Sequence, residues 1–304
     1  FGTPARSLSV GADFDRGDKS VTITHPDNPA FFITSLPGIE LSRVGGYLEW
    51  RGAVRGVEAE LGGRADAHRA SADEARTGPA VPAGAALLAV AFNAGDRDWS
   101  GETVDLAARF WRDLGDFSPR LTLARKTRVP NAVERFSWMP TEASGGLADG
   151  NVYVGDRGLR PETAWIVEGG FDWQRGPAWA RPTVYYRRVD GYIQGVPFDD
   201  TPGVADTRAE MVAAMSGDPT PLRFANVDAD LYGFDMDFGL QVTDRLRLDG
   251  VTSLVRGKRR DVSDDLYRIA PPTLRLAATW DETDWSLGAE VAGALRQNHV
   301  STTN

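Results

Sequence analysis

Side chains that alternate between apolar and charged along residues 119–128 and 165–173 constrain the fold of this chain most strongly. The two runs flank a long polar segment, residues 130–161. One face of the runs is apolar, with Leu121, Leu123, Trp165, Val167, Phe171 and Trp173. The other face is mostly charged or polar, with Arg120, Thr122, Lys126, Arg128, Ile166, Glu168 and Asp172. Period-2 alternation predicts β-strands with two different faces. The apolar face needs a partner that covers it, and lipid is one such partner.

The composition allows a large β domain and excludes a transmembrane helix. The chain has 304 residues, of which 41% are hydrophobic and 25% charged, and its mean hydropathy is -0.33. No apolar run approaches the roughly 18 residues that a spanning helix needs. The strands of a membrane barrel hide their hydrophobicity through alternation, so a low mean hydropathy remains compatible with a membrane.

Net charge and cysteine content narrow the set of partners. The formal net charge is -9 with a pI of about 5.0, which argues against a nucleic-acid partner. The chain contains no cysteine, which excludes disulfides and cysteine-ligated metal sites. It starts at Phe1 without a signal peptide and ends in a polar run at Asn304. We therefore expect both ends to be cuts through a longer protein.

Eleven segments have the pattern or the length of a strand that crosses a bilayer at a tilt. They are residues 6–14, 41–51, 55–65, 102–111, 119–129, 162–174, 179–189, 222–240, 244–256, 271–280 and 284–295. The expected long connections lie between 14 and 41 and at Asp66–Ser100, 130–161, 190–221 and Gly257–Ala270. The first of these has room for extensions of the strands on either side. The expected short turns are Gly52–Val54, Asp113–Ser118, Gln174–Ala178, Gln241–Asp244 and Asp281–Thr283. Only Val204–Met215 has a helical pattern.

Strict alternation of long and short connections is typical of an outer-membrane barrel. There, short turns face the periplasm and long loops face outside. A soluble sandwich has no reason to alternate them. We predict an all-β fold, namely the antiparallel wall of a transmembrane β-barrel.

Aromatic residues near strand ends support this interpretation. They lie on the apolar face, at Trp50, Phe110, Phe171, Trp173, Trp280 and Trp285. Aromatic rings are enriched at bilayer interfaces, because the ring is apolar and the N–H or O–H group stays hydrated. The same residues could instead be core aromatics of a soluble sheet.

The opposite face of the later strands is polar or small. It carries Gly233, Asp235, Asp237, Gly239, Arg245, Arg247, Asp249, Ser253, Thr273, Arg275 and Thr279. Burying these charges in a dry core is costly unless each is paired. A hydrated or plugged lumen removes that cost.

Several segments resemble TonB-dependent outer-membrane receptors. They are RVPNAVERF (128–136), GNVYVGDRGLRPE (150–162), VDGYIQ (189–194), FANVDADLYGFDMDF (224–238), DGVTSLVRGKRRD (249–261) and LYRIAPPTLR (266–275). The resemblance implies a 22-stranded barrel closed by an N-terminal plug. Such a receptor lies in the outer membrane of a Gram-negative bacterium and imports a scarce ligand, such as an iron, copper or other chelate. The implied energy source is the TonB–ExbB–ExbD complex, which would act through the plug.

This chain departs from the family in extent. Residues 1–304 would form a partial barrel domain of about 11 of the expected 22 strands, with the plug domain and the last strands outside the chain. An odd number of strands cannot close such a bacterial barrel alone.

The sequence offers no catalytic constellation. His25, His68 and His299 are the three histidines, and each lies in an expected loop. No HExxH, GxSxG or phosphate-binding glycine loop occurs. We therefore predict neither an enzyme nor a cofactor.

Charged residues of the polar face are the candidates for contact with a ligand or a plug. Arg125, Lys126, Arg128, Glu134 and Arg135 run toward the long 130–161 loop, and we expect Asp235, Asp237, Arg245, Arg247 and Arg275 to face the same lumen. An anionic chelate or acidic plug residues would each satisfy the arginine cluster, and the plug is favoured. The basic run Arg256–Arg260 is expected at a solvated rim, and a contact with lipopolysaccharide phosphates stays open.

Metal ligands are weaker candidates. Met211 and Met215 are four residues apart, so a helix would place both thioethers on one face, and thioethers suit Cu(I). A short loop helix that packs its methionines against neighbouring loops is the favoured explanation. His25 is a further candidate, although a single loop histidine is more often a surface residue.

Two other functions remain open at this point. A passive porin-like or adhesin-type barrel would share the alternation and the aromatic girdle without a plug. A soluble β-rich binding domain would bury the apolar face, with Leu246, Leu248, Leu274 and Leu276 enclosed and the arginines in water.

Overall fold

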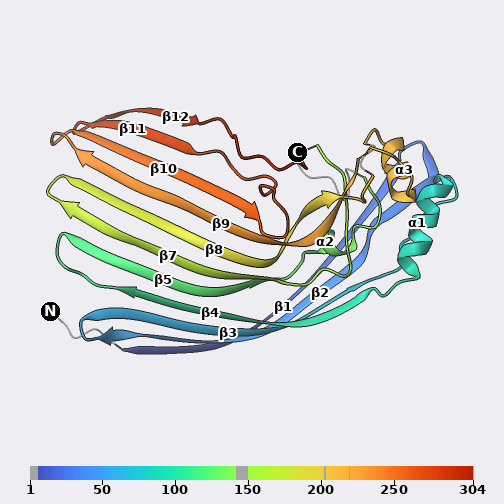
Figure 1. Cartoon of the computed structure of the whole chain (residues 1–304), viewed down its shortest axis with the longest axis horizontal. Coiled ribbons are helices and arrows are strands. Elements are labelled where there is room, and N and C mark those ends of the chain that lie inside the picture. The colour runs from blue at the N-terminus through green and yellow to red at the C-terminus, as the bar shows by residue number, and fades with distance from the viewer. Residues whose placement is uncertain (1–5, 142–149, 202, 219, 304) are drawn as a thin grey trace.

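A computed structural model describes residues 6–141, 150–201, 203–218 and 220–303. It shows a single large antiparallel sheet in which each long strand pairs with the next one along the chain (Figure 1). The strand order is β1-β2-β3-β4-β5-β7-β8-β9-β10-β11-β12, and a short strand β6 adds to β9 in parallel. This meander of neighbouring strands confirms the all-β prediction.

The strands cover all eleven predicted segments. They are β1 (Ser7–His25), β2 (Asn28–Val54), β3 (Val57–Ala72), β4 (Asp98–Trp111), β5 (Phe117–Arg128), β6 (Tyr153–Val154), β7 (Glu162–Arg175), β8 (Ala178–Pro197), β9 (Leu222–Gln241), β10 (Leu246–Arg259), β11 (Thr273–Asp281) and β12 (Ser286–Ala294).

Short connections gather at one end of the sheet, on the left in Figure 1. The β2–β3 hairpin turns at Arg55 and Gly56, which both have positive φ angles of 52° and 76°. Two positive φ angles define the tight turn that matches the twist of paired strands. The expected turn at Gly52–Val54 is therefore wrong by a few residues, because alternation does not locate the residues that take positive φ.

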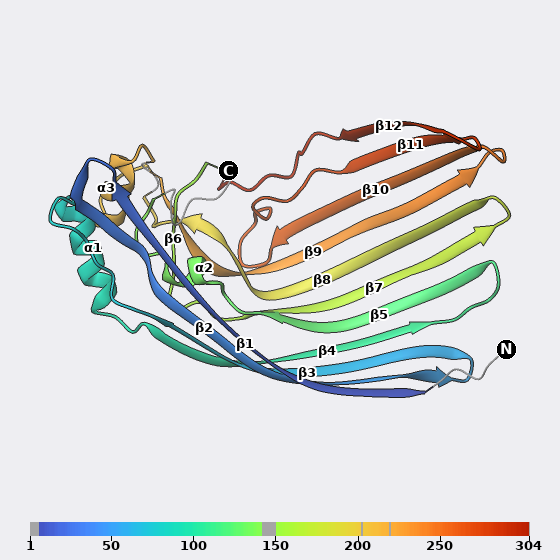
Figure 2. The same ribbon diagram turned by 180° about the vertical axis from the view of Figure 1, so that it is seen from behind.

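Long connections and three helices gather at the other end (Figure 2). The helices are α1 (Ala83–Asn93), α2 (Ala132–Phe136) and α3 (Arg208–Met215). The prediction of a helix near Val204–Met215 is confirmed, whereas α1 and α2 were not predicted. Among the described residues, none of the helices has both the length and the hydrophobicity that a membrane-spanning helix needs.

The connection expected between residues 14 and 41 consists of the strand extensions that the sequence allowed, because β1 and β2 continue through it. The two strands run on to a tight turn between His25 and Asn28. Within these extensions, the side chains of Arg16 and Glu40 pair across the two strands at 2.7 Å. The alternation disappears here while the strands continue, because a hairpin whose two faces meet similar surroundings accepts charges on both faces.

The hydrophobic core lies under the loops and not within the sheet. Its largest cluster joins β2 to the helices, with Ile33, Leu36, Ile39, Ala85, Ala89, Phe92, Phe136, Trp138, Met139 and Val212 among its members. This packing holds the helices and loops against the extended end of β2.

The sheet has two faces of opposite character, and we define them by the pairing register. The apolar face includes Leu248, which pairs with Leu240 and Ala278, and Leu276, which pairs with Val291. Leu248, Leu274 and Leu276 are 41%, 46% and 40% exposed in the isolated chain. The chain therefore does not enclose its leucines in a compact interior.

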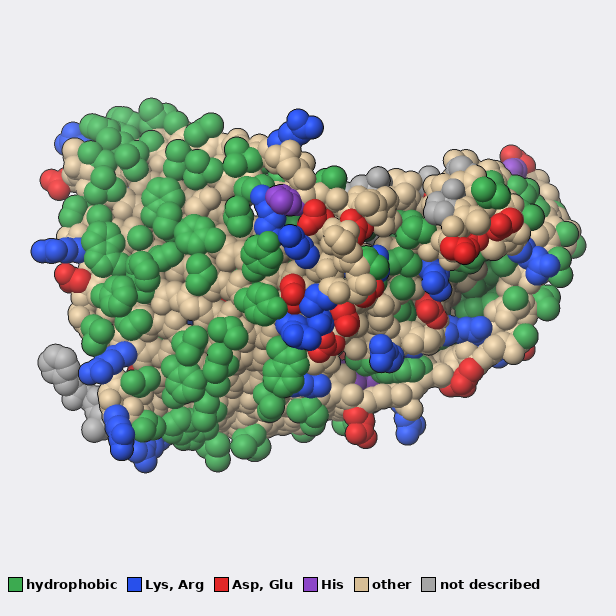
Figure 3. All heavy atoms as spheres, in the orientation of Figure 1, with side chains coloured by type: hydrophobic (Ala, Val, Ile, Leu, Met, Phe, Trp, Pro, Cys, Tyr) green, Lys and Arg blue, Asp and Glu red, His purple; other side chains and the backbone are tan. Residues whose placement is uncertain are grey.

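Hydrophobic side chains cover the half of the visible face that is nearer the short turns (Figure 3). Acidic and basic side chains gather toward the loop end. An exposed apolar area of this extent marks a lipid or protein contact.

The sheet is open at both edges. Among the described residues, β1 pairs only with β2 along its length, and β12 pairs only with β11. Each edge therefore presents unpaired backbone groups, as the wall of a larger barrel would.

Candidate functional site: the charged face and the loop layer

The charged face lies opposite the apolar face and follows directly from the strand register. Its residues include Asp13, Arg43, Arg64, Asp66, Arg120, Lys126, Arg128, Glu168, Arg187, Asp235, Asp237, Arg247 and Arg275. Because side chains alternate strictly along a strand, each of these charges points away from the apolar leucines.

A four-residue ion network on β1, β2 and β3 is the most connected part of the charged face. Arg64 donates to Asp13 at 2.8 Å and to Asp66 at 2.6 Å, and Arg43 reaches the same two carboxylates at 2.8 and 2.9 Å. Gly45 lies among them, and a Cβ there would collide with the Asp66 carboxylate. The alternation pattern alone does not predict this network. The one signal in the sequence was Gly45, a glycine within a strand, which indicates that other groups approach the backbone closely.

Arg128 closes the charged face at the base of the 130–161 loop. Its guanidinium donates to Glu134 at 2.8 Å and to Glu162 at 2.6 Å. Glu134 also caps α2 by accepting from the Asn131 backbone, and Glu162 accepts from the Ile193 backbone at 2.6 Å. Arg128 and Glu134 were predicted candidates, and the structure joins them as a loop anchor.

Asn226 forms a second anchor at the same level. Its side chain accepts from the Arg160 backbone at 2.9 Å and donates to the carbonyls of Arg160 and Gly191 at 3.0 and 2.6 Å. These bonds fix the end of the loop to strands β8 and β9.

Lys126 and Arg125 lie on different faces, contrary to their grouping in the sequence analysis. Lys126 is on the charged face, 3.5 Å from Asp105. Arg125 pairs in register with Trp165 on the apolar face, and its guanidinium lies 5.8 Å from the Trp165 ring centroid. Adjacent residues of a strand point to opposite sides, so a cluster that includes both could not share one lumen.

The remaining predicted charges of β9, β10 and β11 lie on the charged face. Asp235 accepts from Ser253 at 2.6 Å, Arg247 pairs with Asp249 at 2.8 Å, and Arg275 pairs with Glu290 at 3.5 Å. Asp237 faces Arg181 in the register. Arg245 lies in the turn before β10, where it pairs with Glu282 at 2.9 Å.

Arg135 is buried among the helices and long connections at one end of the sheet, which we call the loop layer. It does not lie on the charged face of the strands. Its guanidinium donates to the carbonyls of Arg157 and Leu159 at 2.7 Å each and stacks 4.4 Å from the Trp99 ring centroid. Burial lowers the pKa of this guanidinium below its usual value. These contacts indicate a structural role for Arg135, because they join α2 to strand β4 and to the loop that contains Arg157 and Leu159.

The predicted metal ligands are not assembled into one site. Met211 and Met215 lie on α3 and are 51% and 69% exposed. His25 lies at the β1–β2 turn, where its Nδ1 accepts from the Asp27 backbone at 3.2 Å.

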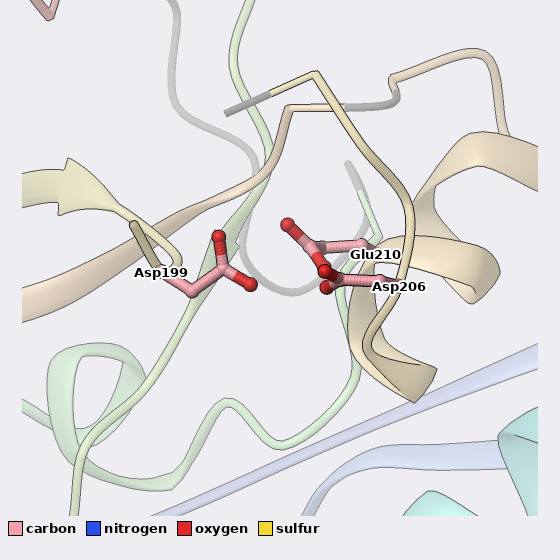
Figure 4. Close-up of side chains that lie close together, drawn as sticks. All are labelled: Asp199, Asp206 and Glu210. Carbon is pink, nitrogen blue, oxygen red and sulfur yellow. The ribbon is translucent and has the colours of Figure 1, made fainter. Parts of the chain in front are cut away.

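A different group, which the sequence did not predict as a metal site, brings three carboxylates together beside α3. The carboxylate oxygens of Asp199, Asp206 and Glu210 lie within 4.8 Å of one another (Figure 4). Glu210 is buried and belongs to the capping box of α3, where it accepts from Thr207. Thr201 donates to Asp199 at 3.1 Å and to Asp206 at 3.2 Å, so the group doubles as a loop-stabilising network.

The fold and the two faces define a class: the partial wall of an antiparallel β-barrel, with one lipid-compatible face and one ionic face. The chain matches, over residues 1–304, the family described as "TonB dependent receptor-like, beta-barrel". This chain belongs to that family, as its motifs indicated.

Solved structures with the same fold are outer-membrane receptors and transporters. The copper transporter OprC aligns with a TM-score of 0.72 and 18% identity, over 98% of this chain and 42% of that one. The ferric-catecholate import receptor Fiu from E. coli K12 aligns with a TM-score of 0.58 and 16% identity, over 96% and 42%. The alcaligin outer-membrane receptor FauA from Bordetella pertussis aligns with a TM-score of 0.54 and 13% identity, over 94% and 42%.

The chain therefore spans about two fifths of the length of these solved proteins. At these identities the likeness concerns the fold. A comparison with curated proteins found no match.

Proposed function

We propose that this chain is part of the barrel wall of an outer-membrane receptor that binds a scarce metal or metal chelate and imports it with energy supplied through TonB. The observation that carries the proposal is the open sheet whose apolar face is exposed while its opposite face is ionic. In a closed barrel the first face would meet lipid, and the second would line a lumen wide enough for a plug.

The remaining strands and the plug domain would come from the rest of the receptor. Both free edges, at β1 and β12, would pair with further strands, because no sheet edge is stable in hydrocarbon. The family membership and the coverage of about 42% of the solved receptors support this division.

The charged face would position the plug. Lys126, Asp237 and Arg275 lie on it, with Asp235 and Arg247, at half-exposed or exposed positions. Large hydrated interfaces tolerate such partly paired charges, whereas a dry core does not. Arg125 has no part in this role, since it shares the apolar face with Trp165.

The loop layer would receive the ligand before transport. Helices α1 and α3 and the anchored 150–161 segment form its packed part, and the core cluster around Phe92 and Trp138 keeps it in place. Met211 and Met215 would contact a soft metal such as Cu(I), because both thioethers are exposed on one short helix. No reaction on the ligand is required for import.

Uptake measurements on the intact receptor test the proposal. Cells that express the full-length protein under metal starvation would accumulate labelled ferric catecholate, ferric hydroxamate or copper, and deletion of TonB would abolish the accumulation. Equal uptake with and without TonB would identify a passive pore. No uptake of any of the three probes would remove the metal-import proposal.

A Met211→Leu/Met215→Leu variant separates the copper hypothesis from the chelate hypothesis. Copper uptake would fall in this variant while uptake of ferric chelates stays unchanged. Leucine conserves volume and removes the sulfur, so a change in folding would not explain the difference.

A further inference from the structure

The apolar face ends toward the loops at a boundary of tyrosines and charges, which we call the outer rim cluster. It consists of Tyr186, Arg188, Asp190, Asp228, Asp230, Tyr232, Arg256, Lys258 and Arg260. The register places these residues of β8, β9 and β10, with Arg260 just beyond β10, on the same side of the sheet as Leu248 and Leu254. Figure 3 shows acidic and basic side chains bordering the hydrophobic area on this side.

The distance from the short-turn end of the strands to the cluster matches the thickness of the apolar band of a membrane barrel. Leu246 pairs with Trp280 at the short-turn end, and Arg256 pairs with Tyr232 at the loop end. At ~3.4 Å per residue and a strand tilt of ~40°, the length from Leu246 to Arg256 spans roughly 26 Å of depth, against roughly 25 Å for the apolar band of such barrels. Tyr186 and Tyr232, 43% and 40% exposed, would therefore lie at the interface, with Lys258 just beyond it among the headgroups.

Arg260 has acidic partners within the cluster, whereas two other cations of the cluster do not. Arg260 contacts Asp190 and lies 3.7 Å from Asp228 and 3.4 Å from Asp230, and Tyr186 donates to Asp230 at 2.9 Å. Neither Arg256 nor Lys258 has an ion-pair partner in the part of the chain that the structure describes, and Arg256 donates only to the carbonyl of Val255. Two cations on one strand, two residues apart on one face, are thus available to an anion.

A hydrophobic groove begins next to these two cations. It has a volume of about 540 Å³, and its lining includes Phe234, Leu254, Leu274, Leu276 and Val291. Leu254 precedes Arg256 by two residues on the same face of β10, so the groove and the first cation are ~7 Å apart along the strand. A ligand that fits both features carries a phosphate and an acyl chain.

We propose that Arg256 and Lys258, with the groove below them, bind a phosphorylated lipid of the outer leaflet. The phosphate would accept hydrogen bonds from the two free cations, and an acyl chain would lie along Leu254, Leu274 and Leu276. Charge complementarity favours a phosphate over a neutral headgroup, and the continuous groove favours a lipid over a free anion. The inference rests on the proposed membrane orientation of the wall, but it does not depend on any transported ligand.

Lipid binding to the intact receptor in detergent tests the site directly. Native mass spectrometry would count bound molecules of phosphorylated lipid A, of dephosphorylated lipid A and of inorganic phosphate, for the wild type and for an Arg256→Gln/Lys258→Gln variant. An Arg112→Gln/Arg175→Gln variant removes the same charge from exposed residues at the short-turn end. We expect the rim variant to bind phosphorylated lipid A about thirty-fold more weakly, since each cation near a lipid surface contributes roughly a fivefold gain in affinity.

The controls decide between the alternatives. The variant at the short-turn end would bind phosphorylated lipid A as the wild type does, and dephosphorylated lipid A would bind equally weakly to all three proteins. Equal binding of phosphorylated lipid A to the wild type and the rim variant overturns the site, and so does a preference for inorganic phosphate over the lipid. The TonB-dependent uptake measurement is separate, so a receptor that fails in transport can still confirm this lipid site.

Discussion

An arginine introduced on the apolar face of strand β11 should destabilise the folded protein more than an arginine introduced on the charged face. Leu276 lies on the apolar face, where it pairs with Gly250 and Val291, and its neighbour Ala277 lies on the charged face, where it pairs with Asp249 and Glu290. The two positions share one strand and one depth, so Leu276→Arg and Ala277→Arg form a matched pair.

The expected magnitude follows from the depth of Leu276. Leu276 pairs with Gly250, four residues beyond Leu246 on β10, so it lies roughly 10 Å below the short-turn boundary and near the middle of a band of roughly 25 Å. Arginine on the lipid face at that depth costs about 2–4 kcal/mol. On the charged face, the guanidinium introduced by Ala277→Arg would meet Asp249 and Glu290 in a hydrated lumen, at a cost of at most about 1 kcal/mol.

Urea titration of the intact receptor folded into phospholipid vesicles would measure the difference. The folding midpoint should fall for Leu276→Arg and stay close to the wild type for Ala277→Arg. A larger loss for Ala277→Arg would show that the faces are assigned the wrong way round, and equal losses would show that neither face meets lipid.

Three further predictions concern the loop layer. Arg135→Lys should destabilise the layer by about 2–3 kcal/mol, because one ammonium cannot replace two carbonyl contacts and the stack on Trp99; proteolysis of the loops would rise, whereas exposed Arg160→Lys leaves it unchanged. Gly155→Ala should loosen α2, since its Cβ would lie 2.8 Å from the Ser137 backbone nitrogen, while Gly288→Ala meets no atom within 4 Å; hydrogen exchange that is equal in both variants would refute this reasoning. Asp264 accepts from Thr302 and Ser301. Burial alone would raise its pKa, but these bonds lower the pKa below 3.8. They therefore stabilise the contact above pH ~4 and are lost as pH falls further. Protection of the Thr302 amide should disappear there, and should be absent at all pH values in Asp264→Ala, which removes the acceptor.

The eleven long strands and their two faces could be predicted because period-2 alternation persists wherever the two faces of a strand meet different surroundings. Leu246, Leu248, Leu274 and Leu276 were assigned to one face from spacing alone, and the register agrees. The alternation was lost in the extended β1–β2 hairpin, where Arg16 and Glu40 pair across the strands.

Helix α1 and the ion networks required tertiary information. The segment of α1, Ala83–Asn93, is rich in alanine and has no polar face that would mark a helix, and its burial depends on Ile33 and Phe136 from distant segments. The pairing of Asp13 with Arg64 joins residues far apart in sequence, so only the strand register brings them together. The error for Arg125 came from grouping charges along the chain instead of by parity.

Site-directed spin labelling along β11 tests the central assignment of faces most directly. The chain has no native cysteine, so single cysteines can replace residues 273–280 one at a time in the intact receptor, with other cysteines removed. The account predicts that labels at Leu274, Leu276, Ala278 and Trp280 are accessible to oxygen dissolved in lipid, and that labels at Thr273, Arg275, Ala277 and Thr279 are accessible to a water-soluble nickel complex. The reverse phase, or no alternation along the strand, would contradict it.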